Sequence, residues 1–205
     1  MPTDYKTANI SEIPKSPGIY AFFLDLMSPA KIGLAGRGPW NQEKLELAKA
    51  ALIGRAEIHA EIMHSISLKG ELKDANKATH LGVAYTTEAR KAKGFQPSKE
   101  LANLSLEAVR DYAQLMHSIA IFSQPVYVGI TYSQTLRDRH EQHRRAFFGG
   151  EDSLGFGARV SAWKLDWDDL IFSYHSLANP TVSLSTLVLA EKHMQSIVHP
   201  IFSLK

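Results

Sequence analysis

Residues 126–143 read VYVGITYSQTLRDRHEQH, and the interpretation of the whole chain depends on this stretch. Its first residues suit a β-strand, and Gly129 permits a close approach of backbone or ligand at the strand end. A polar turn follows, and the pattern then becomes helical. Arg139 and His143 are four residues apart, so on a helix their side chains lie next to each other.

These side chains favour one kind of chemistry. A guanidinium is a permanently charged fork of donors that suits phosphate, and an imidazole accepts or donates a proton near neutral pH. Tyr127 adds a phenol at the end of the preceding strand. A phenol, an imidazole and a guanidinium brought together suit a site for phosphodiester chemistry.

A second strand pattern lies far upstream, in residues 16–23, which read SPGIYAFF. The tripeptide GIY at residues 18–20, the tripeptide YVG at residues 127–129 and the following L-x-x-R-x-x-x-H helix occur in an order that resembles the GIY-YIG nuclease family. The resemblance covers residues 14–25 and 124–205. It implies a three-stranded antiparallel sheet flanked by helices, an α+β fold. The resemblance does not explain the block between the two motif strands, and we predict residues 37–122 as a mainly helical insertion within a single domain of residues 1–205.

The resemblance also implies roles for five residues. Tyr20 and Tyr127 match the two motif tyrosines, which line the cleft and help to position or deprotonate the attacking water. Arg139 matches the arginine that neutralises charge on the scissile phosphate. His143 matches the histidine that assists general-base chemistry in part of the family. Without the resemblance, each would be interpreted as an ordinary packing or surface residue.

Glu191 completes this set. It lies among apolar positions of the last predicted helix, where a charge costs free energy unless it is paired or binds a metal. The family's last helix carries a Glu in this setting, which implies that Glu191 binds Mg²⁺ or Mn²⁺. A rim position paired with Lys192 is the alternative. Family members often have Asn shortly after the terminal Pro, where this chain has Ser203, which puts in doubt any contact made by that Asn.

A second register competes with the first. Lys31-Ile32-Gly33 follows Tyr20 at about the usual family spacing, and Leu52, Arg55 and His59 repeat the helix pattern. We favour the first register because Tyr127 supplies a phenol that Lys31 does not. It requires more than a hundred residues between the tripeptides, which is tolerable because the entropic cost of a loop grows slowly with its length.

Local patterns predict the remaining elements. Strands are predicted at residues 18–24, 30–35, 80–87, 126–129 and 170–177; helices at 41–66, 97–120, 135–147 and 183–198; and a glycine-rich loop at 149–157. Asn41 is a predicted helix cap, and Trp163 and Trp167 are predicted to pack. Basic side chains near the motif helix or in a polar segment are predicted to contact nucleic acid: Arg137, Arg144, Arg145, Arg90 and Lys91.

Composition sets limits on function. The chain has 205 residues, 44% hydrophobic and 21% charged, with a formal net charge of +2, which permits a nucleic-acid partner without requiring one. The absence of Cys excludes disulfides, thiolate nucleophiles and Cys-ligated zinc and is compatible with the cytosol. We see no secretory signal and no stretch of about 18 apolar residues, so we expect no membrane association.

Three functions are therefore considered. The first is a divalent-metal-dependent DNA endonuclease of restriction or defence type, in which the insertion supplies DNA contacts or a dimer surface. The second is a non-catalytic nucleic-acid-binding or regulatory protein on the same scaffold. The third is a nuclease acting on RNA or branched DNA. Because one site cuts one strand, a double-strand cutter would form a homodimer or act sequentially.

Overall fold

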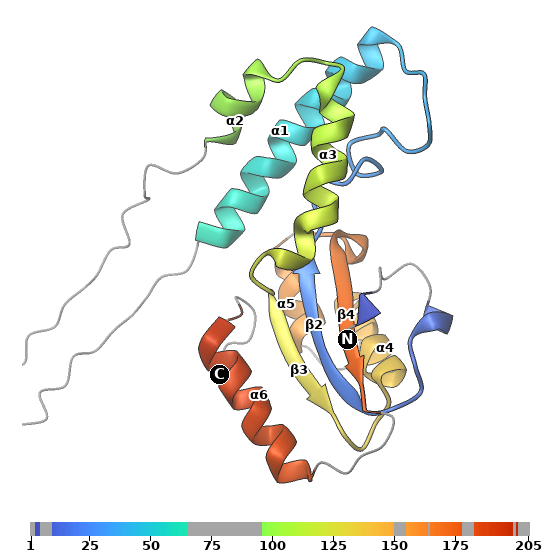
Figure 1. Ribbon diagram of the computed structural model, residues 1–205, viewed down its shortest axis with the longest axis vertical. Coiled ribbons are helices and arrows are strands. Elements are labelled where there is room, and N and C mark those ends of the chain that lie inside the picture. The colour runs from blue at the N-terminus through green and yellow to red at the C-terminus, as the bar shows by residue number, and fades with distance from the viewer. Residues whose placement is uncertain are drawn as a thin grey trace, which may run out of the picture.

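The fold is an α+β arrangement built on an antiparallel sheet (Figure 1). A computed structural model describes residues 3–4, 10–64, 96–149, 155–163, 165–177, 183–198 and 200. The main strands are β2 (Gly18–Leu24), β3 (Tyr127–Thr131) and β4 (Leu170–Ser176), and the two-residue strand β1 (Thr3–Asp4) pairs with β4. The sheet order β1-β4-β2-β3 places β2 between two antiparallel neighbours. The predicted α+β class is confirmed.

The register of the sheet brings the two motif strands together. Tyr20 in β2 lies opposite Gly129 in β3 and Tyr174 in β4, and Phe22 lies opposite Tyr127. Side chains in β2 alternate between buried and half-buried, with Tyr20 and Phe22 both on the buried face. Strands separated by more than a hundred residues in sequence are therefore direct neighbours.

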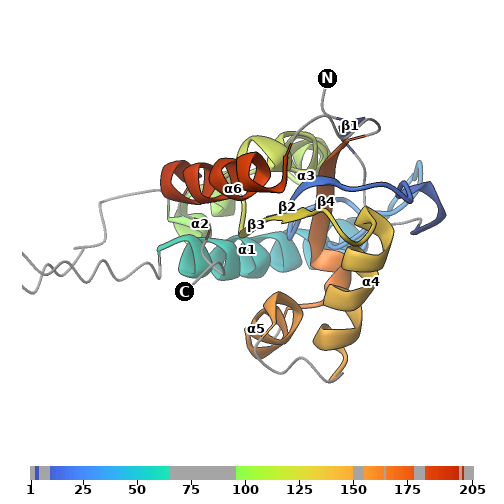
Figure 2. The same ribbon diagram turned by 90° about the horizontal axis from the view of Figure 1, so that it is seen from below.

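Helices cover both faces of the sheet. α4 (Leu136–Phe147) and α5 (Phe156–Ala162) lie on one face, and α6 (Leu184–Val198) packs along β3 on the other side (Figures 1 and 2). The short 3₁₀ turns η1 (Ile10–Glu12) and η4 (Trp167–Asp169) precede β2 and β4. The sequence predicted β2, α4, β4 and α6 to within about two residues.

The insertion lies beyond one end of the sheet (Figure 1). It contains α1 (Gln42–His64), α2 (Pro97–Glu100), η2 (Leu101–Asn103), α3 (Ala108–Ile119) and η3 (Ala120–Phe122). Asn41 caps α1 as predicted, because its Oδ1 accepts the backbone N–H of Lys44 at 2.9 Å. The strand predicted at residues 80–87 lies outside the described residues.

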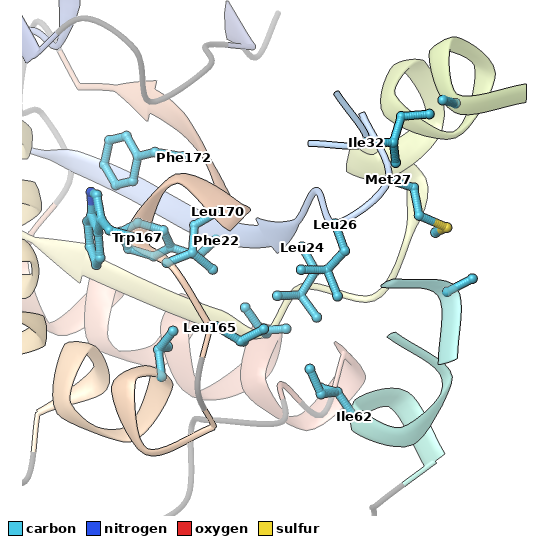
Figure 3. Packing of buried hydrophobic residues seen from close by; sticks show 14 of the residues in the cluster. Phe22, Leu24, Leu26, Met27, Ile32, Ile62, Leu165, Trp167, Leu170 and Phe172 are labelled. Atoms are coloured by element: carbon cyan, nitrogen blue, oxygen red, sulfur yellow. The ribbon is translucent and has the colours of Figure 1, made fainter. Parts of the chain in front are cut away.

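A continuous core joins the sheet to the insertion (Figure 3). Phe22, Trp167 and Phe172 form its aromatic part beside the sheet, and Leu24, Leu26, Ile32 and Ile62 continue it toward α1. The insertion therefore shares a core with the sheet and is not a separately packed unit.

Three sequence predictions were wrong. Residues 30–35 form a turn instead of a strand, with backbone bonds from Lys31 to Ser28 and from Gly33 to Ala30. The helix predicted at residues 97–120 is interrupted at Leu104, which is extended. The ammonium of Lys49 on α1 binds the carbonyl oxygens of Ala102 and Leu104 at 2.8 and 2.6 Å, so a tertiary contact satisfies the groups that the break exposes.

The third error is α5, which begins inside the predicted loop. Glycines disfavour a helix, but Gly157 lies where a Cβ would fall 2.0 Å from the carbonyl oxygen of His143. Only glycine allows α5 to approach α4 this closely. The packing predicted for Trp167 agrees with its 5% exposure, whereas Trp163 is 39% exposed.

The second register disagrees with the structure. Lys31 lies in a turn, and its ammonium pairs with the buried carboxylate of Asp169 at 2.8 Å. Arg55 binds the same Asp169 oxygen at 3.1 Å. Arg55 therefore ties the insertion, and Lys31 the turn that precedes it, to the segment just before β4.

Candidate functional site

The two motif tyrosines meet on the face of the sheet that α4 and α5 cover. The rings of Tyr20 and Tyr127 lie 6.0 Å apart. Gly129 makes room for them, because a Cβ at that position would fall 2.6 Å from the Tyr20 hydroxyl and 2.9 Å from the Tyr127 ring. Gly129 thus allows a close approach, but the group that approaches is the phenol side chain of the opposite strand, and not the backbone or ligand that the sequence predicted.

Helix α4 begins with a reciprocal cap. The Thr135 hydroxyl accepts the backbone N–H of Asp138 at 3.1 Å, and the Asp138 carboxylate accepts the backbone N–H of Thr135 at 3.3 Å. This start sets the rotation of the helix. One face then carries the buried residues Leu136, His140, His143 and Ala146.

Hydrogen bonds join three of the predicted residues. The Tyr20 hydroxyl lies 2.8 Å from Nε2 of His143, and Nε of Arg139 donates to the same hydroxyl at 3.2 Å. Arg139 also donates from one terminal amino group to Gln142. Because a guanidinium can only donate, Tyr20 accepts from Arg139 and its own proton is available to Nε2 of His143.

Burial determines the protonation of these groups. Tyr20 is 2% exposed and His143 is 3% exposed. Burial raises the pKa of Tyr20 well above its usual value, so the phenol keeps its proton at neutral pH. Burial, and then the charge of Arg139, lower the pKa of His143 to about 3, so the imidazole is neutral there.

Arg139 stays charged in this setting. Burial alone would lower the pKa of its guanidinium, but interactions with the hydroxyls of Tyr20 and Tyr127 raise it overall. Arg139 and Tyr127 are half-buried, unlike Tyr20 and His143. The accessible part of the site is therefore a guanidinium beside a phenol, backed by a buried phenol–imidazole pair.

Aromatic rings pack around Tyr127 and His143. Phe156 of α5 stacks on Tyr127 at 4.6 Å between ring centroids and meets the edge of His143 at 5.5 Å. Phe22 lies beneath, 5.7 Å from His143. Sequence reasoning missed Phe156, since it lies at the edge of a stretch predicted as a loop and no local pattern links it to Tyr127.

Glu191 lies on α6, the helix that packs against the edge strand β3 on the side away from α4 (Figure 2). Its carboxylate accepts a hydrogen bond from Nε2 of Gln195 at 3.4 Å, and the same Gln195 nitrogen is 3.5 Å from the Val128 carbonyl oxygen. Tyr20, Tyr127, Arg139 and His143 are thus brought together, whereas Glu191 belongs to the helix on the other side of β3.

The donor set limits how a metal could bind. Within the described residues, no group of three or more His, Asp or Glu side chains is placed to hold a metal ion. Mg²⁺ commonly keeps several waters and takes one or two carboxylates together with substrate phosphate oxygens. Glu191 therefore fits a hydrated divalent cation completed by water and substrate oxygens, and does not fit a cation enclosed by protein ligands.

The comparisons with known proteins leave the family open. No family model, curated protein or solved structure matches this chain. The likeness to GIY-YIG nucleases thus rests on the motif residues and on the sheet that joins them.

The residues predicted to bind nucleic acid differ in their surroundings. Arg137 donates to the backbone carbonyl oxygens of Ile13 and Ser11 at 2.9 and 2.6 Å, so it ties the segment before β2 to α4. Arg144 pairs with Glu141 at 3.4 Å and lies over the Phe148 ring. Arg145 is exposed, and Arg90 and Lys91 lie outside the described residues. Arg145 is thus the most available of these cations.

In the part of the chain that the structure describes, no helix combines the length and the apolar character that crossing a bilayer requires.

Proposed function

We propose that this protein is a divalent-metal-dependent endonuclease that hydrolyses phosphodiester bonds in DNA, resembling the GIY-YIG nucleases. The observation that supports this most is the hydrogen-bonded set of Arg139, Tyr20 and His143 beside Tyr127. Tyr20 comes from a strand more than a hundred residues before the stretch that carries the other three, and all four are the residues that the family motif names.

Arg139 is proposed to bind the scissile phosphate. A guanidinium has five N–H donors, and its bonds to Tyr20 and Gln142 use two of them. The other donors remain for the Tyr127 hydroxyl or a phosphate oxygen. The bond to Tyr20 fixes the plane of the fork before substrate arrives, so little reorganisation is needed as charge develops on the phosphate.

The two tyrosines are proposed to have different roles. Tyr127 is half-buried and is the phenol that can meet the attacking water. Tyr20 is buried, keeps its proton and is hydrogen-bonded to the neutral His143 and to Arg139, so it orients Arg139 and is not itself the base. A divalent cation at Glu191 would polarise the phosphate and stabilise the leaving oxygen.

Cleavage of supercoiled plasmid with Mg²⁺ or Mn²⁺ tests the proposal. Tyr127→Phe and Glu191→Ala should each lower the rate by at least about a hundredfold. Two matched controls, Tyr112→Phe and Glu61→Gln, remove a phenol and an exposed carboxylate on the insertion and should cleave like the wild type. Cleavage that survives both site substitutions would refute the assignment.

The position of Glu191 supports a second candidate, a nucleic-acid-binding or regulatory protein without catalysis. α6 packs along β3 on the side of the sheet opposite α4, and Glu191 already has a hydrogen-bond partner in Gln195. Duplex binding without any cleavage would favour this function. Parallel assays with RNA and branched DNA distinguish the remaining substrate classes, and sedimentation of the DNA complex tests for a homodimer.

A further inference from the structure

We propose that Arg159 of α5 is a second phosphate-binding cation of the candidate site, facing the same DNA strand as Arg139. This inference deepens the proposed function and rests on DNA being the ligand. The resemblance gives no role to Arg159, which lies within residues 124–205 but is not one of the motif residues.

The first support is that α5 packs closely against α4 beside the candidate site. A Cβ at Gly157 would lie 2.0 Å from the His143 carbonyl oxygen and 2.7 Å from the Phe147 backbone nitrogen. The backbones of the two helices are therefore in direct contact next to His143, which fixes the distance between α5 and the site.

The second support is the rotation of α5. Phe156 is 1% exposed and its ring contacts both Tyr127 and His143. Arg159 follows Phe156 by three residues, so its side chain starts from a neighbouring position one turn along the helix. Val160 is buried and Arg159 is half-buried, which places the guanidinium at the border of the site and not in its core.

The third support is electrostatic. The positive charge of Arg159 also lowers the pKa of His143, as the smallest contribution after burial, Arg139 and His140. Arg139 on α4 and Arg159 on α5 thus both act electrostatically on the same imidazole. Two guanidinium groups that both act on a neutral, buried imidazole make a local positive field at a site where the ligand would be a phosphate chain.

The test is binding of a fluorescein-labelled DNA duplex in EDTA, where metal-dependent cleavage cannot occur, over a series of salt concentrations. Arg159→Gln is expected to weaken binding about tenfold and to reduce the slope of log Kd against log salt by about one. Arg159→Lys keeps the charge and should keep the slope. Lys44→Gln removes an exposed charge at the start of α1 and should change neither quantity.

Thermal unfolding of each variant shows that it is folded. If Arg159→Gln fails to fold, Arg159→Lys decides, and a slope reduced by about one in that variant would overturn the inference. Equal effects of Arg159→Gln and Lys44→Gln would overturn it as well, as would no duplex binding by the wild type. Duplex binding with the Arg159 effect but without cleavage in Mg²⁺ or Mn²⁺ would leave the inference standing and refute the nuclease.

Discussion

Replacing His140 by Leu should make the protein less sensitive to acid. The His140 imidazole is fully buried, stacks against Phe22 and meets the edges of Phe172 and Trp167 at 4.9 and 5.4 Å. Within the described residues, neither of its ring nitrogens has a hydrogen-bond partner. A charge is costly in such surroundings, so burial, with a smaller effect of Arg144, lowers the pKa of His140 to about 4.

The sign of the effect follows from this pKa. Between pH 6.5, the ordinary value, and about pH 4, the unfolded chain binds a proton at His140 that the folded chain does not bind. Acid therefore favours unfolding in that window. At about 1.4 kcal/mol per pH unit, His140 lowers the free energy of unfolding by about 2 kcal/mol between pH 7 and pH 5.

Urea denaturation followed by tryptophan fluorescence at pH 5, 6 and 7 measures this. Leu fits the apolar surroundings and removes two unpaired polar atoms, so at pH 7 the variant should be as stable as the wild type or more stable by about 1–2 kcal/mol. At pH 5 its advantage should be about 2 kcal/mol larger. His143, with its pKa near 3, keeps part of the acid sensitivity in both proteins.

Two results would refute this reasoning. An advantage that is the same at pH 5 and pH 7 would mean that His140 does not resist protonation in the fold. A variant less stable by more than about 2 kcal/mol at pH 7 would mean that the imidazole makes a hydrogen bond that stabilises the core. His193→Gln, at an exposed position on α6, is the control for removing a histidine as such.

Three further substitutions test the packing and the ion pairs. Gly129→Ala should destabilise the protein by about 1–3 kcal/mol in urea and abolish cleavage, because its Cβ would overlap the Tyr20 phenol. The control Gly54→Ala lies in open space on α1 and should stabilise the protein by about 0.5–1 kcal/mol. Equal stabilities of the two variants would contradict the overlap. Asp169→Asn leaves two cations unpaired and should lower the free energy of unfolding, measured by heat or urea, by about 3 kcal/mol. The control Asp168→Asn, at an exposed position, should change it little. An Asp169→Asn variant as stable as the wild type would show that the ion pairs contribute nothing. Tyr20→Phe removes two hydrogen bonds, so it should lower the free energy of unfolding by about 1–2 kcal/mol and slow cleavage. A stability and a cleavage rate equal to those of the wild type would rule out the proposed role of the hydroxyl.

Local patterns in the sequence determined much of the fold. The apolar run at residues 18–24 and the residues Val126-Tyr127-Val128 predict strands, and the helical pattern that begins at Thr135 predicts α4. These signals are visible in the sequence because strand and helix periodicity and helix capping depend on neighbours within a few residues.

Prediction failed where distant contacts outweighed local preference. Residues 30–35 have the composition of a strand, but their Lys31 is held by Asp169, far along the chain. Glycines argue against α5, yet Gly157 is what lets that helix touch α4 beside His143. Propensity is weak compared with packing, so such segments follow their partners.

For the candidate site too, the sequence predicts some features and the tertiary structure decides others. The motif spacing on α4 predicts that Arg139 and His143 are neighbours, since four residues make about one helical turn. Only the tertiary structure decides that Tyr20 lies opposite Gly129, that its hydroxyl joins Arg139 to His143, and that Phe156 borders them. It also decides which groups are buried, and therefore protonated or neutral, because desolvation depends on all the chain segments that surround a side chain and not on its own neighbours in sequence.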